Sequence, residues 1–101
     1  MILEIAEIEI IPGKEAEFES ALKRAVEEVL AQSKGFIQCQ LQRGIEEASR
    51  FTLLIQWETL EDHTLGFRQS DHFLKWREII GPFFAQSPKV AHASQVLEFR
   101  K

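Results

Sequence analysis

The sequence has one cysteine, no cluster of charges of one sign and no long apolar run, and each shortage excludes a class of protein. Cys39 is the only cysteine among 101 residues, which excludes an internal disulfide and favours a reducing compartment. No apolar run approaches the roughly 20 residues that a membrane span needs. Glu4, Glu7 and Glu9 stand where a signal peptide would be apolar with a basic flank. We therefore expect a cytoplasmic protein with no membrane partner.

Charge and ligand patterns narrow the function further. The formal net charge is -4 at pH 7, and Lys and Arg are spread among Asp and Glu, so no basic face can neutralise phosphates and nucleic acid is not an expected partner. No glycine pattern of a nucleotide-binding loop is present. The histidines and Cys39 stand on separate segments without the i, i+4 pairing of metal ligands, so we expect no metal site.

The first third of the chain predicts a strand followed by a helix. A chain of this length suits one domain with a real core, over residues 1–101. Residues 2–11 alternate as a strand does, and Pro12-Gly13 ends it. From Lys14 the apolar period becomes helical, and Gly35 suits the position after the last turn of a helix that closes near Ser33.

The rest of the chain predicts a hairpin, two short helices and a last strand. Residues 36–43 and 51–57 alternate on either side of a polar turn. Thr59 and Asp62 resemble a capping box for a helix over 60–67, and Ser70 is expected to cap a second helix that ends or kinks at Gly81-Pro82. Residues 89–99 alternate again and predict the final strand.

This order of elements predicts an α+β fold, a ferredoxin-like split βαβ domain. Its four-stranded antiparallel sheet would carry helices on one face. Leu3, Ile5 and Leu54 are apolar on the opposite side of their strands, so the second sheet face would be left bare in a monomer. A second copy packed sheet against sheet would cover it, which predicts a homodimer.

The chain resembles the antibiotic biosynthesis monooxygenase family of dimeric α+β barrels. The resemblance is carried by the opening IAEIEIIPGKEAEF, by Trp57-Glu58 before a short helix, and by the run His63, Phe67, Ser70, Phe73. It implies oxygen chemistry without a metal, a flavin or another cofactor, in which a phenolic, quinol or polyketide-like aromatic substrate supplies the electrons. The protein would hold that substrate in a dry cavity, remove a proton and stabilise the oxyanion.

Haem degradation, another activity found within this fold family, is disfavoured. That branch needs an axial histidine on the helix after the Ser-Asp pair, and Arg77 stands at the matching place here. The first strand of that branch also carries an asparagine, where this chain has Ala6, Glu7 and Ile8.

His63 and His92 are the predicted catalytic residues. His63 shares the inward stripe of its helix with Leu60 and Phe67, and an imidazole exchanges protons near neutral pH. His92 alternates with Val90 on the last strand and could face the same interior, as base or hydrogen-bond donor. The alternative for His63 is a core histidine whose ring nitrogens are satisfied by the protein. His72, near a helix start, is expected to be exposed.

Large rings and one guanidinium form the predicted substrate-binding set. These residues gather between 57 and 84, and each ring can equally be ordinary core. Arginine offers fixed donors for a quinone or carboxylate oxygen. The predicted set is Trp57, Phe67, Phe73, Trp76 and Arg77.

Two functions of different class remain open. One is a cofactor-independent monooxygenase with an aromatic small-molecule substrate. The other is a non-catalytic dimer of the same fold that binds a hydrophobic metabolite.

Overall fold

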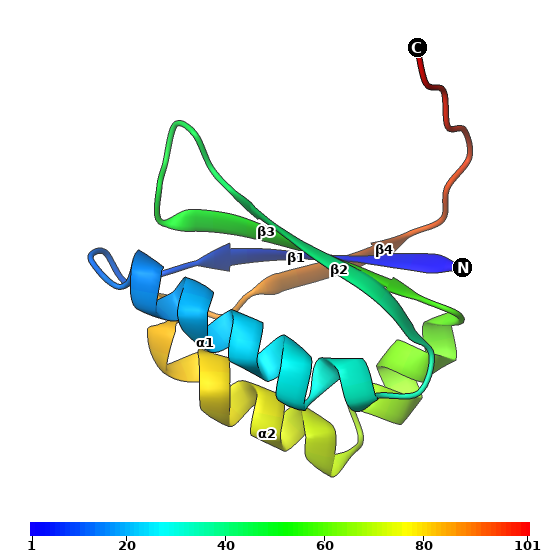
Figure 1. Ribbon diagram of the computed structural model, residues 1–101, viewed down its shortest axis with the longest axis horizontal. Helices are drawn as coiled ribbons and strands as arrows, with labels where there is room; N and C mark the ends of the chain where they lie inside the picture. The colour runs from blue at the N-terminus through cyan, green and yellow to red at the C-terminus, as the bar shows by residue number, and fades with distance from the viewer.

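The computed structural model describes residues 1–101 as a four-stranded antiparallel sheet in the order β2-β3-β1-β4, with the helices on one face (Figure 1). This confirms the predicted ferredoxin-like α+β fold. The strands are β1 (Ile2–Glu9), β2 (Phe36–Arg43), β3 (Arg50–Trp57) and β4 (Lys89–Ala93). The helical elements are α1 (Glu15–Glu28), η1 (Leu30–Gln32), η2 (Asp62–Phe67), α2 (Asp71–Ile80) and η3 (Gly81–Phe83). No helix has the length and apolar character needed to cross a membrane.

The core lies between the sheet and the helices. The even positions of β1 from Glu4 on and the odd positions of β3 point toward the helices and are buried, as strand alternation requires. From α1, Phe18, Leu22 and Ala25 fill the space beneath them, at the helical spacing seen in the sequence. Gly13 (φ +90°) and Gly35 (φ +83°) make the turns at either end of this helical segment.

The structure corrects three details of the sequence prediction. A register shift between Phe36 and Gln38 turns Phe36 into the core against Trp57, whereas strict alternation would place Phe36 on the side opposite Cys39. The last strand ends at Ala93 rather than at 99, because β1 offers partners only to that point. Ser70 holds the N-cap position of α2, but its hydroxyl donates to the Phe67 carbonyl instead of capping the helix.

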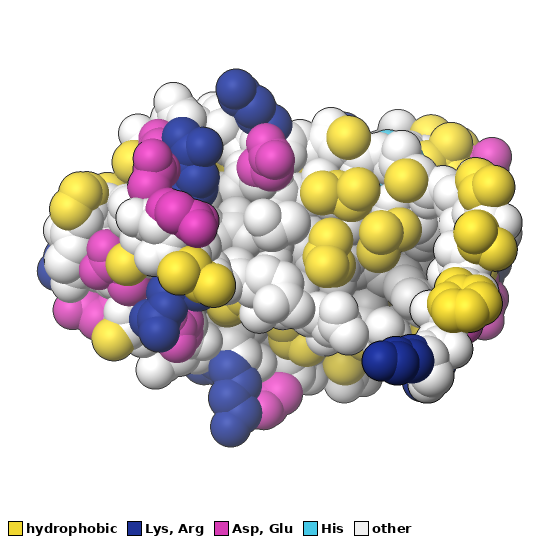
Figure 2. Space-filling model, turned by 90° about the horizontal axis from the view of Figure 1, so that it is seen from above, with side chains coloured by type: hydrophobic (Ala, Val, Ile, Leu, Met, Phe, Trp, Pro, Cys, Tyr) yellow, Lys and Arg dark blue, Asp and Glu magenta, His cyan; other side chains and the backbone are white.

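The sheet face away from the helices carries an apolar patch. Strand pairing places Leu3 opposite Ala93, and Ile5 opposite both Ala91 and Leu54. We call these five residues the open-face patch. Figure 2 looks onto this face and shows hydrophobic side chains gathered on one half of it. Beside the patch, the C-terminal segment projects away from the fold (Figure 1) and leaves Val96, Leu97 and Phe99 exposed.

Candidate functional site

A pocket of about 970 Å³ opens between the sheet and the α2 side of the helical layer. Its sheet wall comes from the inward positions of β1, β3 and β4, and its helical wall from η2 and α2. Eleven of its 21 lining residues are hydrophobic, and most of the others are charged or polar. The lining residues that matter below are Glu4, Ile55, Val90, His63, Phe67, Arg68, Phe73, Trp76 and Arg77.

A hydrogen-bonded cluster of polar side chains stands at one end of this pocket. Glu4 is only 6% exposed, and its Oε1 accepts the Trp57 indole N–H at 2.9 Å. The same Oε1 lies 3.2 Å from Nε2 of His63. His63 Nδ1 in turn lies 2.8 Å from Nε2 of His92. We call these residues, Glu4, Trp57, His63 and His92, the carboxyl–imidazole cluster.

Four separate elements bring this cluster together. Pairing of β1 with β4 sets Glu4 opposite His92, and Trp57 ends β3, which pairs with the other side of β1. His63 comes from η2, a π-helix in which the Arg68 N–H bonds back to the His63 carbonyl. Helices of this kind are rare and occur most often at functional sites. The cluster therefore depends on the complete fold.

Burial gives Glu4 an unusual proton affinity. Removal of the carboxylate from water raises its pKa above the ordinary glutamate value, while the Trp57 hydrogen bond and the nearby Arg68 charge partly oppose that rise. Because a raised pKa makes a carboxylate a better proton acceptor near neutral pH, Glu4 has the electrostatics of a general base.

His63 is neutral at pH 7. Burial is the main cause that lowers its pKa from 6.5 to about 4, and electrostatic interactions with His92 and Arg68 contribute in the same direction. A neutral imidazole carries one N–H and one acceptor nitrogen. When Glu4 is ionised, it can only accept, so the His63 proton is assigned to Nε2 and Nδ1 accepts from His92. Both ring nitrogens of His63 then have protein partners.

Aromatic rings hold His63 in place. Its imidazole stacks on Trp57 with centroids 5.4 Å apart, and Phe67 lies 6.3 Å away on a nearly parallel plane. Phe67 also meets Phe73 and Trp76 edge to face, at 5.7 and 6.0 Å. These contacts link the cluster to the aromatic wall of the pocket, so the wall and the cluster form one packed unit.

The structure brings most of the predicted site residues together. His63, Phe67, Phe73, Trp76 and Arg77 all line the pocket. The Arg77 guanidinium lies 5.8 Å from the centre of the Phe73 ring.

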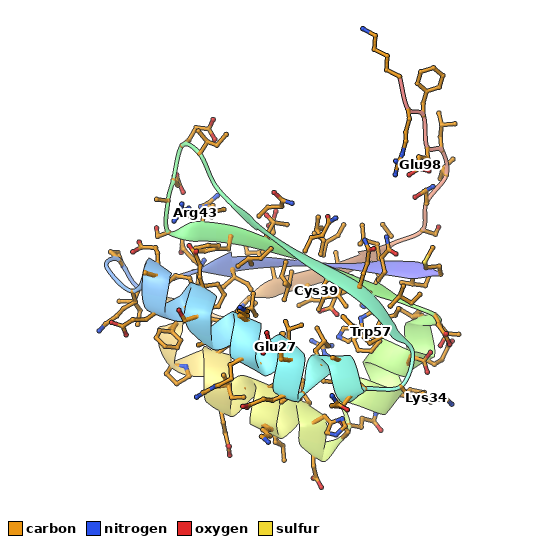
Figure 3. The ribbon with its side chains drawn as sticks, in the orientation of Figure 1. Glu27, Lys34, Cys39, Arg43, Trp57 and Glu98 are labelled. Atoms are coloured by element: carbon orange, nitrogen blue, oxygen red, sulfur yellow. The ribbon has the colours of Figure 1, made fainter.

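Trp57 and His92 are not pocket-lining residues. Trp57 is fully buried between the sheet and the helices (Figure 3), and it meets the pocket through Glu4, His63 and Phe67. His92 touches His63 from the exposed side of the cluster. His72 lies elsewhere, exposed and bonded to Ser33 Oγ at 3.3 Å.

Glu4 is the residue that sequence reasoning missed as part of the site. Its signal was present, because Glu4 occupies an inward position of β1 in series with Ala6, Ile8 and Ile10. A carboxylate in such an apolar row is costly unless it is paired. Arg68, the other arginine of the 57–84 segment, also lines the pocket and offers the same guanidinium donors as Arg77, although only Arg77 belongs to the predicted set.

The side chains of the carboxyl–imidazole cluster contact one another in pairs and do not surround a common point where a metal ion could bind. No group of three or more His, Cys, Asp or Glu side chains has an arrangement that could hold a metal ion. Cys39, half-buried on β2, has a pKa raised to about 11 by burial and by the charge of Glu4, so its thiol stays protonated at neutral pH.

Comparison with known proteins identifies relatives over the whole chain. YczJ of Bacillus subtilis, a protein of uncharacterised function, is 38% identical over 96 residues, which are 95% of this chain and all of YczJ. The crystal structure of a candidate antibiotic biosynthesis monooxygenase from Bordetella bronchiseptica has a TM-score of 0.90 and 41% identity, covering 95% of this chain and 97% of that one.

A more distant structure shares the fold alone. SnoaB of Streptomyces nogalater, a cofactor-independent oxygenase, has a TM-score of 0.82 at 15% identity, and the match covers 99% of this chain and 97% of the SnoaB chain.

The family model described as antibiotic biosynthesis monooxygenase matches residues 1–79. With its fold and its relatives in agreement, the chain belongs to the antibiotic biosynthesis monooxygenase family.

Proposed function

We propose that this protein is a cofactor-independent monooxygenase that oxidises a phenolic, quinol or polyketide-like aromatic substrate with O₂. The observation that carries the proposal is the buried carboxyl–imidazole cluster, which stands at one end of an aromatic-walled pocket. Membership of the antibiotic biosynthesis monooxygenase family supports it, as does the fold shared with the oxygenase SnoaB.

The proposed reaction needs no external reductant. For an anthrone, one oxygen atom of O₂ becomes the new ring carbonyl, and the other leaves as water with the two hydrogens of the ring methylene group. A hydroquinone is converted in the same balance to a hydroxyquinone and water. In both reactions the substrate supplies all the electrons once a proton has been removed, so the protein has to supply a base and a suitable cavity.

Each part of the site has a role in that chemistry. Phe67, Phe73 and Trp76 provide flat apolar walls for an aromatic ring and keep water away from the reactive anion. His63 and His92 belong to the cluster that accepts the substrate proton. Arg68 and Arg77 line the same pocket and can stabilise an oxyanion electrostatically.

Oxygen consumption tests this function. Purified protein should take up O₂ with members of a panel of hydroquinones and anthrones, and His63→Ala should lower the rate by about 10² or more, because the proton-accepting cluster is broken. His72→Ala is the matched control, since His72 is exposed and bonded only to Ser33. No uptake over the panel, or equal rates in the His63 and His72 variants, would reject the oxygenase.

A non-catalytic binding protein is the second candidate. Both ring nitrogens of His63 already have protein partners, as in a core histidine, and this favours a structural role for His63 and a protein that binds without catalysis. In that case aromatic ligands should raise the melting temperature by mass action on the native state, without any oxygen uptake.

We also propose that the protein is a homodimer that packs sheet against sheet through the open-face patch. Leu3, Ile5 and Leu54 stay partly exposed there while their strand neighbours on the other face are buried. Figure 2 shows this apolar area beside the exposed hydrophobic side chains of the C-terminal segment, with a hollow between them. A second copy would bury both at once.

Light scattering at micromolar concentration tests the dimer. The measured mass should be twice that of one chain. Ile5→Lys should lower the measured mass toward that of a single chain, because the lysine places a charge in the apolar interface. Leu65→Lys, on η2 at the other face, should leave the mass unchanged. A wild-type monomer would reject the dimer.

A further inference from the structure

The two oxygens of Glu4 have different surroundings. Oε1 takes the Trp57 N–H at 2.9 Å and lies 3.2 Å from His63 Nε2. Oε2 has no hydrogen-bond partner in the protein. Every fully buried side-chain oxygen or nitrogen does have one, so Oε2 cannot be fully buried. Glu4 lines the pocket, and with Oε1 engaged in the cluster, Oε2 is the oxygen left free for a ligand there.

We propose that Glu4 is the catalytic residue that takes the proton of the substrate hydroxyl, through Oε2, and that His63 and Trp57 are positioning residues that hold Oε1. This inference rests on the oxygenase proposed above and assigns one of its steps to an atom. The substrate O–H bond breaks, an O–H bond forms at Oε2, and the electron pair stays on the substrate oxygen.

The neighbours of Glu4 are less suited to direct contact with the substrate. His63 lines the pocket, but its Nδ1 is hydrogen-bonded to His92 and its Nε2 lies 3.2 Å from Glu4 Oε1, so neither ring nitrogen is free for a substrate. His92 is more exposed but is not among the residues that line the pocket. Within the carboxyl–imidazole cluster, only Glu4 combines a position on the pocket wall with an unused acceptor atom.

The surroundings of Glu4 suit a proton acceptor. The titratable and charged groups packed around it are His92 from β4, His63 and Arg68 from the η2 segment, and Cys39 from β2. Desolvation raises the Glu4 pKa, and only the Trp57 bond and Arg68 oppose it. Arg68 also lines the pocket, where it can stabilise the phenolate after the proton has moved.

An anaerobic binding experiment tests the assignment without turnover. The probe is para-nitrophenol, whose absorption moves to longer wavelength when its hydroxyl ionises, at a pH below its solution pKa. Bound to the wild-type protein it should be ionised, and an infrared difference spectrum should show a new carboxylic acid C=O band as Glu4 takes the proton. Bound to Glu4→Gln it should stay neutral, while Glu7→Gln, on the exposed face of β1, should behave as wild type.

Each outcome decides the assignment. An ionised probe without a carboxylic acid band in the wild-type protein would overturn it, and this result does not depend on how well any variant folds. Ionisation that persists in Glu4→Gln would overturn it as well, as would a failure to bind this phenol.

Oxygen uptake separates this assignment from the proposed function. If the probe ionises through Glu4 but no hydroquinone or anthrone consumes O₂, the role of Glu4 stands and the oxygenase fails. If wild-type protein consumes O₂ and Glu4→Gln does so equally fast, the oxygenase stands and the role of Glu4 fails. The expected loss in Glu4→Gln is about 10² or more in rate.

Discussion

The two ends of the inward face of β1 differ in the kind of residue that they bury. At and just beyond its C-terminal end Ile8 and Ile10 are almost completely buried, and toward its N-terminal end Glu4 is nearly as buried as they are. Both ends use the same strand alternation and lie under the same helical layer. We infer from this difference that the fold itself does not require a carboxylate at Glu4.

The apolar end is sealed by phenylalanine rings. Phe18 of α1 packs edge to face on Phe51 at 5.0 Å and lies 6.4 and 6.5 Å from Phe83 and Phe84. Its burial stabilises the fold with no polar group to satisfy. At the other end, burial of Glu4 and His63 costs stability that the hydrogen bonds only partly return. Such a cost is typical of a site kept for function.

Phe18→Ala should have the largest effect on stability. It removes a fully buried ring from the apolar end and should lower the free energy of unfolding by about 3–5 kcal/mol. Urea denaturation measures the loss, with Phe99→Ala, 88% exposed, as the control that stays near zero. A loss below about 1 kcal/mol would contradict the view that this end carries the stability.

Acid should destabilise the polar end through His63. In the unfolded chain His63 takes a proton near pH 6.5, whereas in the folded protein its pKa is about 4. The unfolded state therefore binds more protons between these values, and stability falls as the pH falls from 6.5 to 4, by on the order of 3 kcal/mol.

Glu4 acts in the opposite direction over part of this range, because its raised folded-state pKa makes the folded state gain a proton first as the pH falls. The His63 effect is therefore best isolated by urea denaturation of Glu4→Gln at several pH values. Adding His63→Asn should flatten the slope, and adding His72→Asn should not. If the free energy of unfolding depends equally on pH in both double variants, His63 is not the residue that causes the loss of stability in acid.

Glu4→Gln should have the smallest effect on stability. A glutamine keeps an acceptor for the Trp57 N–H and removes the buried charge, so the protein at pH 7 should be as stable as wild type or more stable by about 1 kcal/mol. Guanidinium denaturation checks this value. A clear loss of stability would mean that Glu4 serves the fold and would weaken the contrast between the two ends.

The sequence predicted the fold because its two periodicities are clear. The apolar stripe of α1 and the alternation of β1 and β3 depend only on local spacing, and they define both layers. The same stripe reasoning predicted that His63 would point inward, where it is 2% exposed.

What the sequence could not show depends on tertiary contacts. The register shift at Phe36 and the end of β4 at Ala93 follow from strand pairing, which local spacing does not encode. The hydrogen bond of Glu4 to Trp57 and its contact with His63 join residues far apart in the chain, and only the folded structure places both on one oxygen.

The most direct test of the account is a titration of the Glu4 carboxyl carbon by NMR in protein with ¹³C-labelled glutamate, assigned through Glu4→Gln. If Glu4 is the proton acceptor, its carboxyl carbon should titrate with a midpoint above that of the exposed glutamates, and its resonance should shift toward the protonated form when para-nitrophenol binds. A midpoint equal to that of the exposed glutamates, or a carboxylate unaffected by the bound phenol, would contradict the assignment of Glu4 as the proton acceptor.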